Sequence, residues 1–303
     1  MSKGNGKVYA QLTAVAAIWG GTFVVVKHAL AEHGPMKLAT MRYVLATLAL
    51  VPLVWQRERS ALKPHAGDWI PFVITGGLSV FIYQTCFFQG MKLSSPVNGA
   101  LVIAANPMMT ALLAALFLRE QLRLAQKIGI MLSFVGEVIV ISQGSLQNFL
   151  ALRFNPGDLL LLVAVLSWAI NSLYIRRLGG RISPLVLSAW SCLLGALLLL
   201  PFGWADPPAG MPTHMSLTVF AIVLYMAIPS TAITSIWWYD GIAKLGPSRT
   251  AVFVNLVPVF ALLFTLLMGR RVEPNQFLGA ALVVGGVYLT TRNWRGAPSG
   301  TEA

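Results

Sequence analysis

Uncharged polar and aromatic side chains recur at helical spacing inside long apolar stretches of this sequence. One group falls at i, i+3, i+4 and i+7, and so shares one stripe of a helix: Thr231, Thr234, Ser235 and Trp238. A second group, at i, i+3 and i+4, comprises Trp168, Asn171 and Ser172. Aromatic rings stack on other rings and attract cations, whereas amides and hydroxyls orient the polar ends of a ligand. This chemistry suits binding of a neutral or zwitterionic solute that also has apolar bulk.

The candidate binding residues lie within apolar runs and carry a ring, an amide or a hydroxyl without charge. We predict that a solute touches Trp19, Tyr83, Gln84, Trp168, Asn171 and Trp238, with Asn98, Thr234, Tyr239 and Asn255 as weaker candidates. The alternative for each residue is interhelical packing, because small hydroxyl residues let helices approach and Asn side chains bridge them. The set as a whole favours binding, since six expected helices contribute to it, three from each half of the chain.

Residues suited to covalent or metal chemistry are few and dispersed. The two cysteines, Cys86 and Cys192, fall inside apolar runs, where cysteine acts as a small packing residue. The four histidines are scattered at the ends of runs or between them, and neither a CxxC nor an HExxH motif is present. We therefore expect no metal site, no cofactor and no enzyme activity.

Two charged residues, Arg42 and Glu137, fall inside apolar runs. The simplest interpretation of each is a structural ion pair or an anchor at the membrane interface. Glu137 is otherwise the only central carboxylate that could take part in proton coupling, because charges are rare within such runs. We retain it as the candidate coupling residue.

These side chains must be positioned by membrane-spanning helices. The chain is 56% hydrophobic and only 11% charged, with a mean hydropathy of +0.72, and a helix needs about 20 apolar residues to cross a bilayer. The sequence predicts an all-α integral membrane protein with ten transmembrane helices. They are expected near 8–29, 36–55, 69–91, 95–118, 126–143, 158–177, 182–203, 216–239, 248–269 and 275–292.

The net charge of +12 follows from topology rather than from nucleic-acid binding. With the N-terminus in the cytoplasm, fifteen Lys and Arg fall in inside segments and six in outside segments, and Arg42 lies within a span. This asymmetry agrees with the positive-inside rule. We expect a multi-pass protein of a bacterial inner membrane with both termini in the cytoplasm. Its expected partners are lipid and a small-molecule substrate, and no nucleic acid.

The sequence repeats itself once. Seven marked positions recur at offsets of 149 to 151 residues, namely Trp19/Trp168, Pro35/Pro184, Pro52/Pro201, Pro96/Pro247, Pro107/Pro258, Gly129/Gly279 and Gly136/Gly286. The expected repeats are residues 1–147 and 148–303, with five spans each, in one integrated membrane domain. Five is odd, so the second repeat enters the membrane inverted relative to the first, as is common in secondary transporters.

Pro107 and Pro258 occupy equivalent places in the fourth and ninth spans. A proline in a helix interior removes a hydrogen bond and kinks the helix. The kink either lets two helices cross closely or leaves a backbone carbonyl for protein, water or a substrate to satisfy. We predict helix kinks at both prolines.

The chain resembles the drug/metabolite transporter superfamily, specifically its ten-helix EamA-type exporters. The segments that carry the resemblance are "AAIWGGTFVVVK", "MRYVLATLALVPL" and the paired "NPMMTALLAALFLRE" and "VPVFALLFTLLMGRR". Arg119-Glu120 ends this motif in the first half as in the family, whereas the second half has Arg270-Arg271 and a later acid, Glu273. Small multidrug relatives use a carboxylate in the first helix for proton coupling, and residues 8–26 contain none.

The resemblance and the uncharged candidate binding residues together favour a secondary transporter that exports small metabolites by alternating access. These candidate residues, which we call the predicted wall of the site, fit aromatic or other apolar amino acids best, as in the similar aromatic-amino-acid exporter branch of the family. The alternative is a multidrug efflux pump of the same superfamily. A membrane enzyme would need clustered acids, bases or metal ligands, and a channel would need a ring of like groups from several subunits. The oligomeric state is left open.

The charge asymmetry gives a direct test of topology. Cysteines introduced as Ser2→Cys and Thr301→Cys are expected to resist a membrane-impermeant thiol reagent applied to the outer side of intact cells, and to react after permeabilisation. Labelling of either position from outside would show that the orientation is wrong.

Overall fold

The computed structural model describes residues 5–94, 96–142, 155–207, 214–269 and 274–292, and every regular element in these ranges is helical. The first repeat contains α1 (Asn5–Glu32), α2 (Pro35–Arg57), η1 (Arg59–Leu62), η2 (Ala66–Asp68), α3 (Trp69–Thr75), η3 (Gly76–Ile82), α4 (Tyr83–Leu93), α5 (Pro96–Ala104), α6 (Asn106–Phe117) and α7 (Leu124–Ile141). The second contains α9 (Pro156–Arg177), α10 (Pro184–Ala205), α11 (Leu217–Ala227), η4 (Ile228–Ile233), α12 (Thr234–Leu245), α13 (Pro247–Ala251), η5 (Val252–Asn255), α14 (Leu256–Leu267) and α15 (Pro274–Thr291).

These elements form the ten expected membrane-crossing rods. Eight are continuous helical stretches that are long and apolar enough to span a bilayer. The other two are the rod of α5 and α6, which is interrupted at Ala105, and α15, which has 18 residues and a less apolar sequence. The predicted all-α membrane fold is confirmed.

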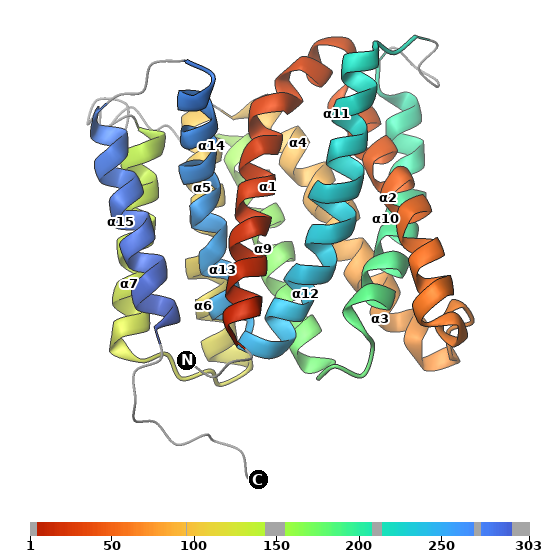
Figure 1. Cartoon of the computed structure of the whole chain (residues 1–303), viewed down its shortest axis with the longest axis horizontal. Helices are drawn as coiled ribbons and strands as arrows, with labels where there is room; N and C mark the ends of the chain where they lie inside the picture. Colours follow the sequence, from red (N-terminus) through yellow and green to blue (C-terminus); the bar gives the residue numbers. More distant parts are fainter. Residues whose placement is uncertain (1–4, 95, 143–154, 208–213, 270–273, 293–303) are drawn as a thin grey trace.

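The two repeats cross the membrane in opposite directions. In Figure 1, α1 starts at the face where the N-terminus lies, whereas α9, its counterpart, starts at the opposite face. Each later element of the second repeat also runs against its counterpart, and α15 returns the chain to the starting face. The odd number of spans per repeat therefore produces the predicted inverted topology.

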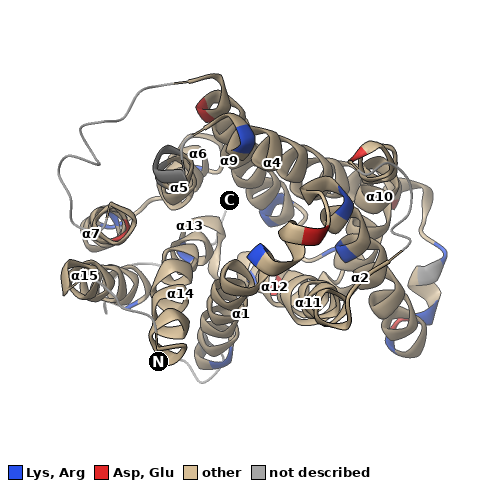
Figure 2. Cartoon of the chain, turned by 90° about the horizontal axis from the view of Figure 1, so that it is seen from above, with Lys and Arg blue, Asp and Glu red and all other residues tan. Residues whose placement is uncertain are grey.

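Glycines let the last helix of each repeat cross its counterpart closely. A Cβ atom on Gly136 would lie 2.6 Å from the Gly279 carbonyl oxygen, and one on Gly279 would lie 2.6 Å from that of Gly136. Gly129 and Gly286 block each other in the same reciprocal way, at 2.6 and 2.4 Å. The linear repeat aligns Gly129 with Gly279, but the inverted axis makes the pair antiparallel and brings Gly129 against Gly286. Figure 2 shows this α7–α15 pair at one end of the molecule.

Acidic side chains connect α2 and α10 at both ends. The Asp206 carboxylate, just after α10, accepts hydrogen bonds from the backbone N–H groups of Met36 and Lys37 at 2.8 and 3.1 Å, in the first turn of α2. At the opposite face, Glu58 accepts a hydrogen bond of 2.9 Å from Ser183, the N-cap residue of α10. The first N–H groups of a helix lack intrahelical partners and favour a negative charge. Each repeat therefore stabilises the helix start of the other.

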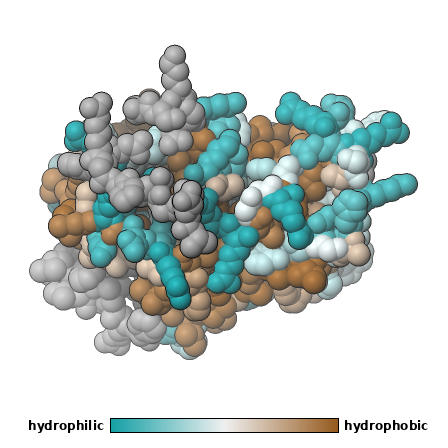
Figure 3. Space-filling view, turned by 90° about the horizontal axis from the view of Figure 1, so that it is seen from below, coloured by the Kyte–Doolittle hydropathy of each residue, from teal (hydrophilic) through white to brown (hydrophobic). Residues whose placement is uncertain are grey.

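The face that carries both termini is hydrophilic. Figure 3 shows long hydrophilic side chains across it. The ion pairs Arg181–Asp68 and Lys244–Asp240, at 3.2 and 2.7 Å, lie at helix ends. At the same face, Glu120 accepts a hydrogen bond of 2.9 Å from Ser248 at the start of α13. Burial raises the pKa of the Glu120 carboxyl, although the hydrogen bond from Ser248 opposes the shift.

Each repeat has a π-helical segment at the same place. The segment η3 joins α3 to α4 in the first repeat, and η4 joins α11 to α12 in the second. The first contains Gly76 and Gly77 and the second contains Pro229, which lacks a backbone donor. Single π turns inside helices are uncommon and occur frequently at functional sites.

Pro107 and Pro258 lie where a new helix begins. The chain turns at Ala105, and Pro107 is the second residue of α6. Pro258 is the third residue of α14, which follows the 3₁₀ turn η5. The first N–H groups of a helix have no intrahelical acceptor, so a proline there forfeits no hydrogen bond. At Pro107 the irregularity that we predicted as a kink is thus an interruption of the rod at Ala105, whereas at Pro258 it is a change from 3₁₀ to α geometry within a continuous helical stretch.

The α7–α15 crossing generates a prediction with an adjacent control. Gly286→Ala places a methyl group 2.4 Å from the Gly129 carbonyl oxygen, whereas Gly285→Ala meets only the Leu132 side chain at 3.8 Å. We expect Gly286→Ala to destabilise the protein by about 1–3 kcal/mol through overpacking. Gly285→Ala should be neutral or slightly stabilising, because alanine favours helix.

The measurement is the thermal melting temperature of both variants in the same detergent. Equal melting temperatures for the two variants would contradict the close crossing.

Candidate functional site

Four predicted aromatic residues meet where the two repeats join. Trp19 of α1 contacts Trp168 of α9 with ring centroids 5.9 Å apart, and these two residues are repeat counterparts. Trp238 of α12 lies 5.2 Å from Trp19 and 5.9 Å from Trp168. Tyr83 of α4 adds a fourth ring, 5.1 Å from Trp168. We call these four residues the aromatic cluster, and its tilted and edge-on geometries are those that aromatic pairs prefer.

The two counterpart tryptophans differ in their hydrogen bonding. The Trp19 indole N–H reaches both the Ser230 carbonyl oxygen and the Thr234 hydroxyl at 3.2 Å. The indole Nε1 of Trp168 is buried and has no hydrogen-bond partner among the described residues. A buried donor without a partner costs about 1–3 kcal/mol. Trp168 therefore presents a donor that a bound solute or a water molecule can satisfy.

Two predicted asparagines also keep unsatisfied atoms. Asn171, which is 2% exposed, follows Trp168 by one helical turn, and its side-chain oxygen accepts no hydrogen bond. Asn255, fully buried in η5, has neither its amide nitrogen nor its amide oxygen bonded. Both amides can make hydrogen bonds that nothing in the described chain supplies. They retain the capacity for binding that the sequence predicted.

Three other predicted wall residues form hydrogen bonds with neighbouring residues of the protein. Gln84 donates to the Tyr43 hydroxyl at 2.9 Å, and Tyr239 lies 3.3 Å from the Ser79 hydroxyl with either oxygen able to donate. The Thr234 hydroxyl donates to the Ser230 carbonyl oxygen at 2.9 Å. The contacts of Gln84 and Tyr239 connect different helices, whereas the bond from Thr234 to Ser230 lies within one span. Thr234 is connected to another helix by the hydrogen bond that it accepts from the Trp19 indole. The side chain of Asn98 lies outside the described residues, as do Arg270, Arg271 and Glu273.

The Ser230 carbonyl is a centre of hydrogen bonding that the sequence did not reveal. In η4 the Thr234 N–H bonds to the carbonyls of Pro229 and Thr231 and skips that of Ser230. The released oxygen accepts from the Thr234 hydroxyl, the Trp19 indole and the Arg42 guanidinium, the last at 3.2 Å. Within a bilayer such an oxygen must be satisfied by protein. Pro229 inside an apolar run was the available sequence signal.

Arg42 occupies a different role from the one expected. Its Nε donates to the Thr231 hydroxyl, its Nη2 donates to the Ser230 carbonyl, and the guanidinium lies 5.3 Å from the centre of the Tyr43 ring. The expected ion pair is absent from the part of the chain that the structure describes. An Arg at mid-span costs about 2.5–3.5 kcal/mol on membrane insertion. Its positive charge is therefore retained at a cost inside the protein, and the residues that the structure describes supply no counter-ion.

Glu137 lies away from the aromatic cluster. It is 5% exposed on α7, and its Oε2 has no hydrogen-bond partner. Its helix packs chiefly on α15 and next on α5, at the end of the molecule seen on the left of Figures 1 and 2. The ion pair expected for Glu137 is likewise absent among the described residues. The Glu137 carboxyl is therefore buried, and its Oε2 has no partner among the described residues. Its helix, α7, carries no residue of the aromatic cluster.

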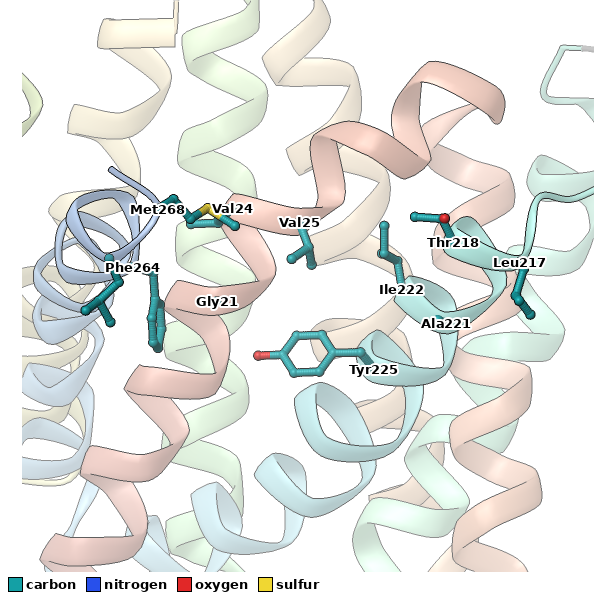
Figure 4. A pocket seen from close by; sticks show the side chains of 11 residues that line it. Gly21, Val24, Val25, Leu217, Thr218, Ala221, Ile222, Tyr225, Phe264 and Met268 are labelled. Atoms are coloured by element: carbon teal, nitrogen blue, oxygen red, sulfur yellow. The ribbon is translucent and has the colours of Figure 1, made fainter. Parts of the chain in front are cut away.

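An open apolar pocket of about 760 Å³ lies between α1, α11 and α14. Figure 4 shows Gly21 and Val25 of α1 on the side of Tyr225 and Ile222, and Val24 beside Met268. The Tyr225 hydroxyl donates to the Ile18 carbonyl oxygen at 2.7 Å. These segments belong to the half of the molecule away from the termini (Figure 1). A second cavity, of about 20 Å³, borders Tyr239 and Ile182. Neither cavity is lined by a residue of the aromatic cluster.

The inverted five-helix repeats and the aromatic cluster between them define a secondary-transporter architecture. The EamA-like transporter family model matches residues 7–142 and again residues 155–292, so one match falls on each repeat. The chain belongs to the EamA-like transporter family. It is a multi-pass membrane protein of a transporter family.

Named relatives agree with this assignment. The chain is 30% identical to the uncharacterized transporter YyaM of Bacillus subtilis, with 94% of this chain and 93% of the relative aligned. It is 26% identical to a probable amino-acid metabolite efflux pump of Salmonella typhimurium, with 93% of each chain aligned. A crystal structure of another protein, 21% identical, superposes with a TM-score of 0.79 over 94% of this chain and 96% of that chain, which shows the shared fold.

The aromatic cluster predicts a specific loss of affinity. Trp168→Ala removes stacking worth about 0.5–1.5 kcal/mol beyond the buried area, so binding of an aromatic solute such as L-phenylalanine should weaken roughly tenfold. Trp204→Ala is the matched control, because Trp204 lies near the end of α10 and is 60% exposed. Affinity is measured on purified variants whose melting temperatures match the parent. If Trp168→Ala binds as tightly as Trp204→Ala, the solute binds elsewhere.

Proposed function

We propose that this protein is a secondary transporter that exports small metabolites, above all amino acids with aromatic or other apolar side chains, across a bacterial inner membrane by alternating access. The observation that carries the proposal is the contact of Trp19, Trp168, Trp238 and Tyr83 between the two inverted repeats. Transporters of this architecture bind substrate near the midplane where the repeats meet. A site made of rings, an unbonded indole N–H and unbonded amides suits a solute with one apolar end and one polar end.

The inverted repeats support alternating access, because two similar halves of opposite orientation can exchange their arrangements. In this conformation an open apolar pocket lies between α1, α11 and α14, in the half of the molecule where α1 ends and α11 begins. With both termini in the cytoplasm, as we propose from the charge asymmetry, the pocket faces outward. Repeats 1–147 and 148–303 would then exchange their arrangements to open the other side.

The residues proposed to act in transport do so by binding and not by catalysis. Trp19, Trp168, Trp238, Tyr83 and Asn171 form the proposed wall. Asn255 is a weaker member because its unbonded amide belongs to η5. Glu137 is the proposed coupling residue, because it is a buried carboxyl without a partner.

The proposal is tested by transport in vesicles that contain the purified protein. We expect L-phenylalanine to accumulate in vesicles of inside-out orientation, and a proton gradient to drive it if Glu137 is the coupling residue. Glu137→Gln should then keep L-phenylalanine binding and lose the response to the gradient, whereas Gln126→Ala on the same helix should keep both.

The outcomes separate the candidate functions. Transport of tetraphenylphosphonium without transport of any amino acid would assign the multidrug alternative. Transport of L-phenylalanine that responds equally to the gradient in the parent and in Glu137→Gln would leave the exporter and remove Glu137 from coupling. Absence of transport of all amino acids tested would overturn the proposed function.

A further inference from the structure

We propose that Arg42 binds the carboxylate of the transported solute, and that the site therefore selects carboxylate-bearing solutes over their amides and over organic cations. This inference rests on the proposed function, because it names the charge class of the solute at the same site. It does not depend on the identity of the side chain that the aromatic cluster holds.

The first support is the unused bonding capacity of the guanidinium. Arginine offers five N–H donors in a planar fork that matches a carboxylate. In the described chain, hydrogen bonds leave from Nε to Thr231 and from Nη2 to Ser230, and none leaves from Nη1. The side chain is partly exposed, within an apolar helix that spans the membrane. An anion can thus reach a cation that no acid among the described residues neutralises.

The second support is the position of Arg42 beside the proposed wall. The Ser230 carbonyl accepts hydrogen bonds from both Arg42 and Trp19, so the guanidinium and the aromatic cluster are joined through one oxygen atom. Arg42 is also within electrostatic reach of the Tyr83 phenol, whose ring contacts Trp168. A solute with its carboxylate on Arg42 therefore has its apolar part next to the rings.

The third support is the asymmetry between the repeats. The counterpart of Arg42, at the offset of 149 residues, is Ser191 of α10. Ser191 contacts the Thr75 hydroxyl at 2.5 Å beside η3, just as Arg42 contacts Thr231 in η4. A hydroxyl is thus sufficient to connect this helix to a π segment. The positive charge of Arg42 is therefore not required for this connection, and it is present in one repeat only.

A purely structural role is the competing explanation, in which Arg42 only fastens η4 to α2. The two roles predict different effects of mutating Arg42. If Arg42 is only structural, the mutation lowers stability and changes the affinity for all solutes alike. If Arg42 binds the carboxylate, the mutation removes the difference in affinity between solutes that differ only at the carboxylate.

The experiment is equilibrium binding to the purified full chain with four probes. L-phenylalanine carries a carboxylate and an ammonium group, its amide lacks the carboxylate, phenylacetate lacks the ammonium group, and tetraphenylphosphonium is an apolar cation. We expect the parent to bind both carboxylate probes roughly tenfold or more tightly than the amide, because charge-assisted hydrogen bonds are strong. Arg42→Gln should lose that preference.

Two further variants keep the test sharp if Arg42→Gln is unstable. Arg42→Lys keeps the charge but loses the fork, so we expect several-fold weaker binding of both carboxylate probes and unchanged binding of tetraphenylphosphonium. Thr231→Val removes the acceptor of Nε and keeps the cation, so the preference for carboxylates should persist even if all affinities fall. Melting temperatures of all variants report the structural contribution separately.

The results decide between the roles. Equal affinity of the parent for L-phenylalanine and its amide, or an unchanged carboxylate preference in Arg42→Gln or Arg42→Lys, would overturn the inference. If phenylacetate binding depends on Arg42 while amino acids neither bind nor are transported, the anchor stands and the proposed function falls. If L-phenylalanine is transported but its preference over the amide does not depend on Arg42, the function stands and the anchor falls.

Discussion

A backbone carbonyl that leaves the helical ladder inside a bilayer must find a donor within the protein, because lipid offers none. This constraint organises the middle of the molecule. Where η4 interrupts the rod of α11 and α12, the Ser230 carbonyl is released and draws in Trp19 from α1 and Arg42 from α2. Two spans of the first repeat are thus connected to one span of the second. The two repeats are therefore hydrogen-bonded to each other at this irregular segment of backbone.

The same scaffold carries different chemistry in its two halves. The π segments, the irregular backbone before Pro107 and Pro258, and the reciprocal glycine crossings all occur twice. The side chains placed on them do not repeat, since Arg42 corresponds to Ser191 and the bonded Trp19 corresponds to the unbonded Trp168. Stability needs the duplicated features, because each repeat caps and covers the other. Selectivity for one kind of solute needs only one copy of a charged group.

Sequence alone predicted the features that depend on composition and on the repeat. Trp19 and Trp168 could be paired because counterparts in an inverted repeat approach each other near its axis, and they do. The ten spans followed from apolar runs, and the inversion followed from an odd number of spans. By contrast, Gln84 and Tyr239 looked the same in the sequence as Asn171. Only three-dimensional packing shows that Tyr43 and Ser79 occupy the first two and leave Asn171 unbonded.

The role of Arg42 could not be read from the sequence for a related reason. An Arg in a membrane span predicts an acidic partner or a path to the interface, and its true acceptor is a backbone oxygen freed by a change of helix type one hundred and eighty-eight residues later. No side-chain pattern encodes which carbonyl a π turn skips. Pro229 marks the place where the regular α-helical hydrogen bonding is interrupted. Which carbonyl loses its bond depends on how η4 packs against α2. The proposed preference for carboxylates therefore depends on backbone geometry as much as on the side chains of the proposed wall.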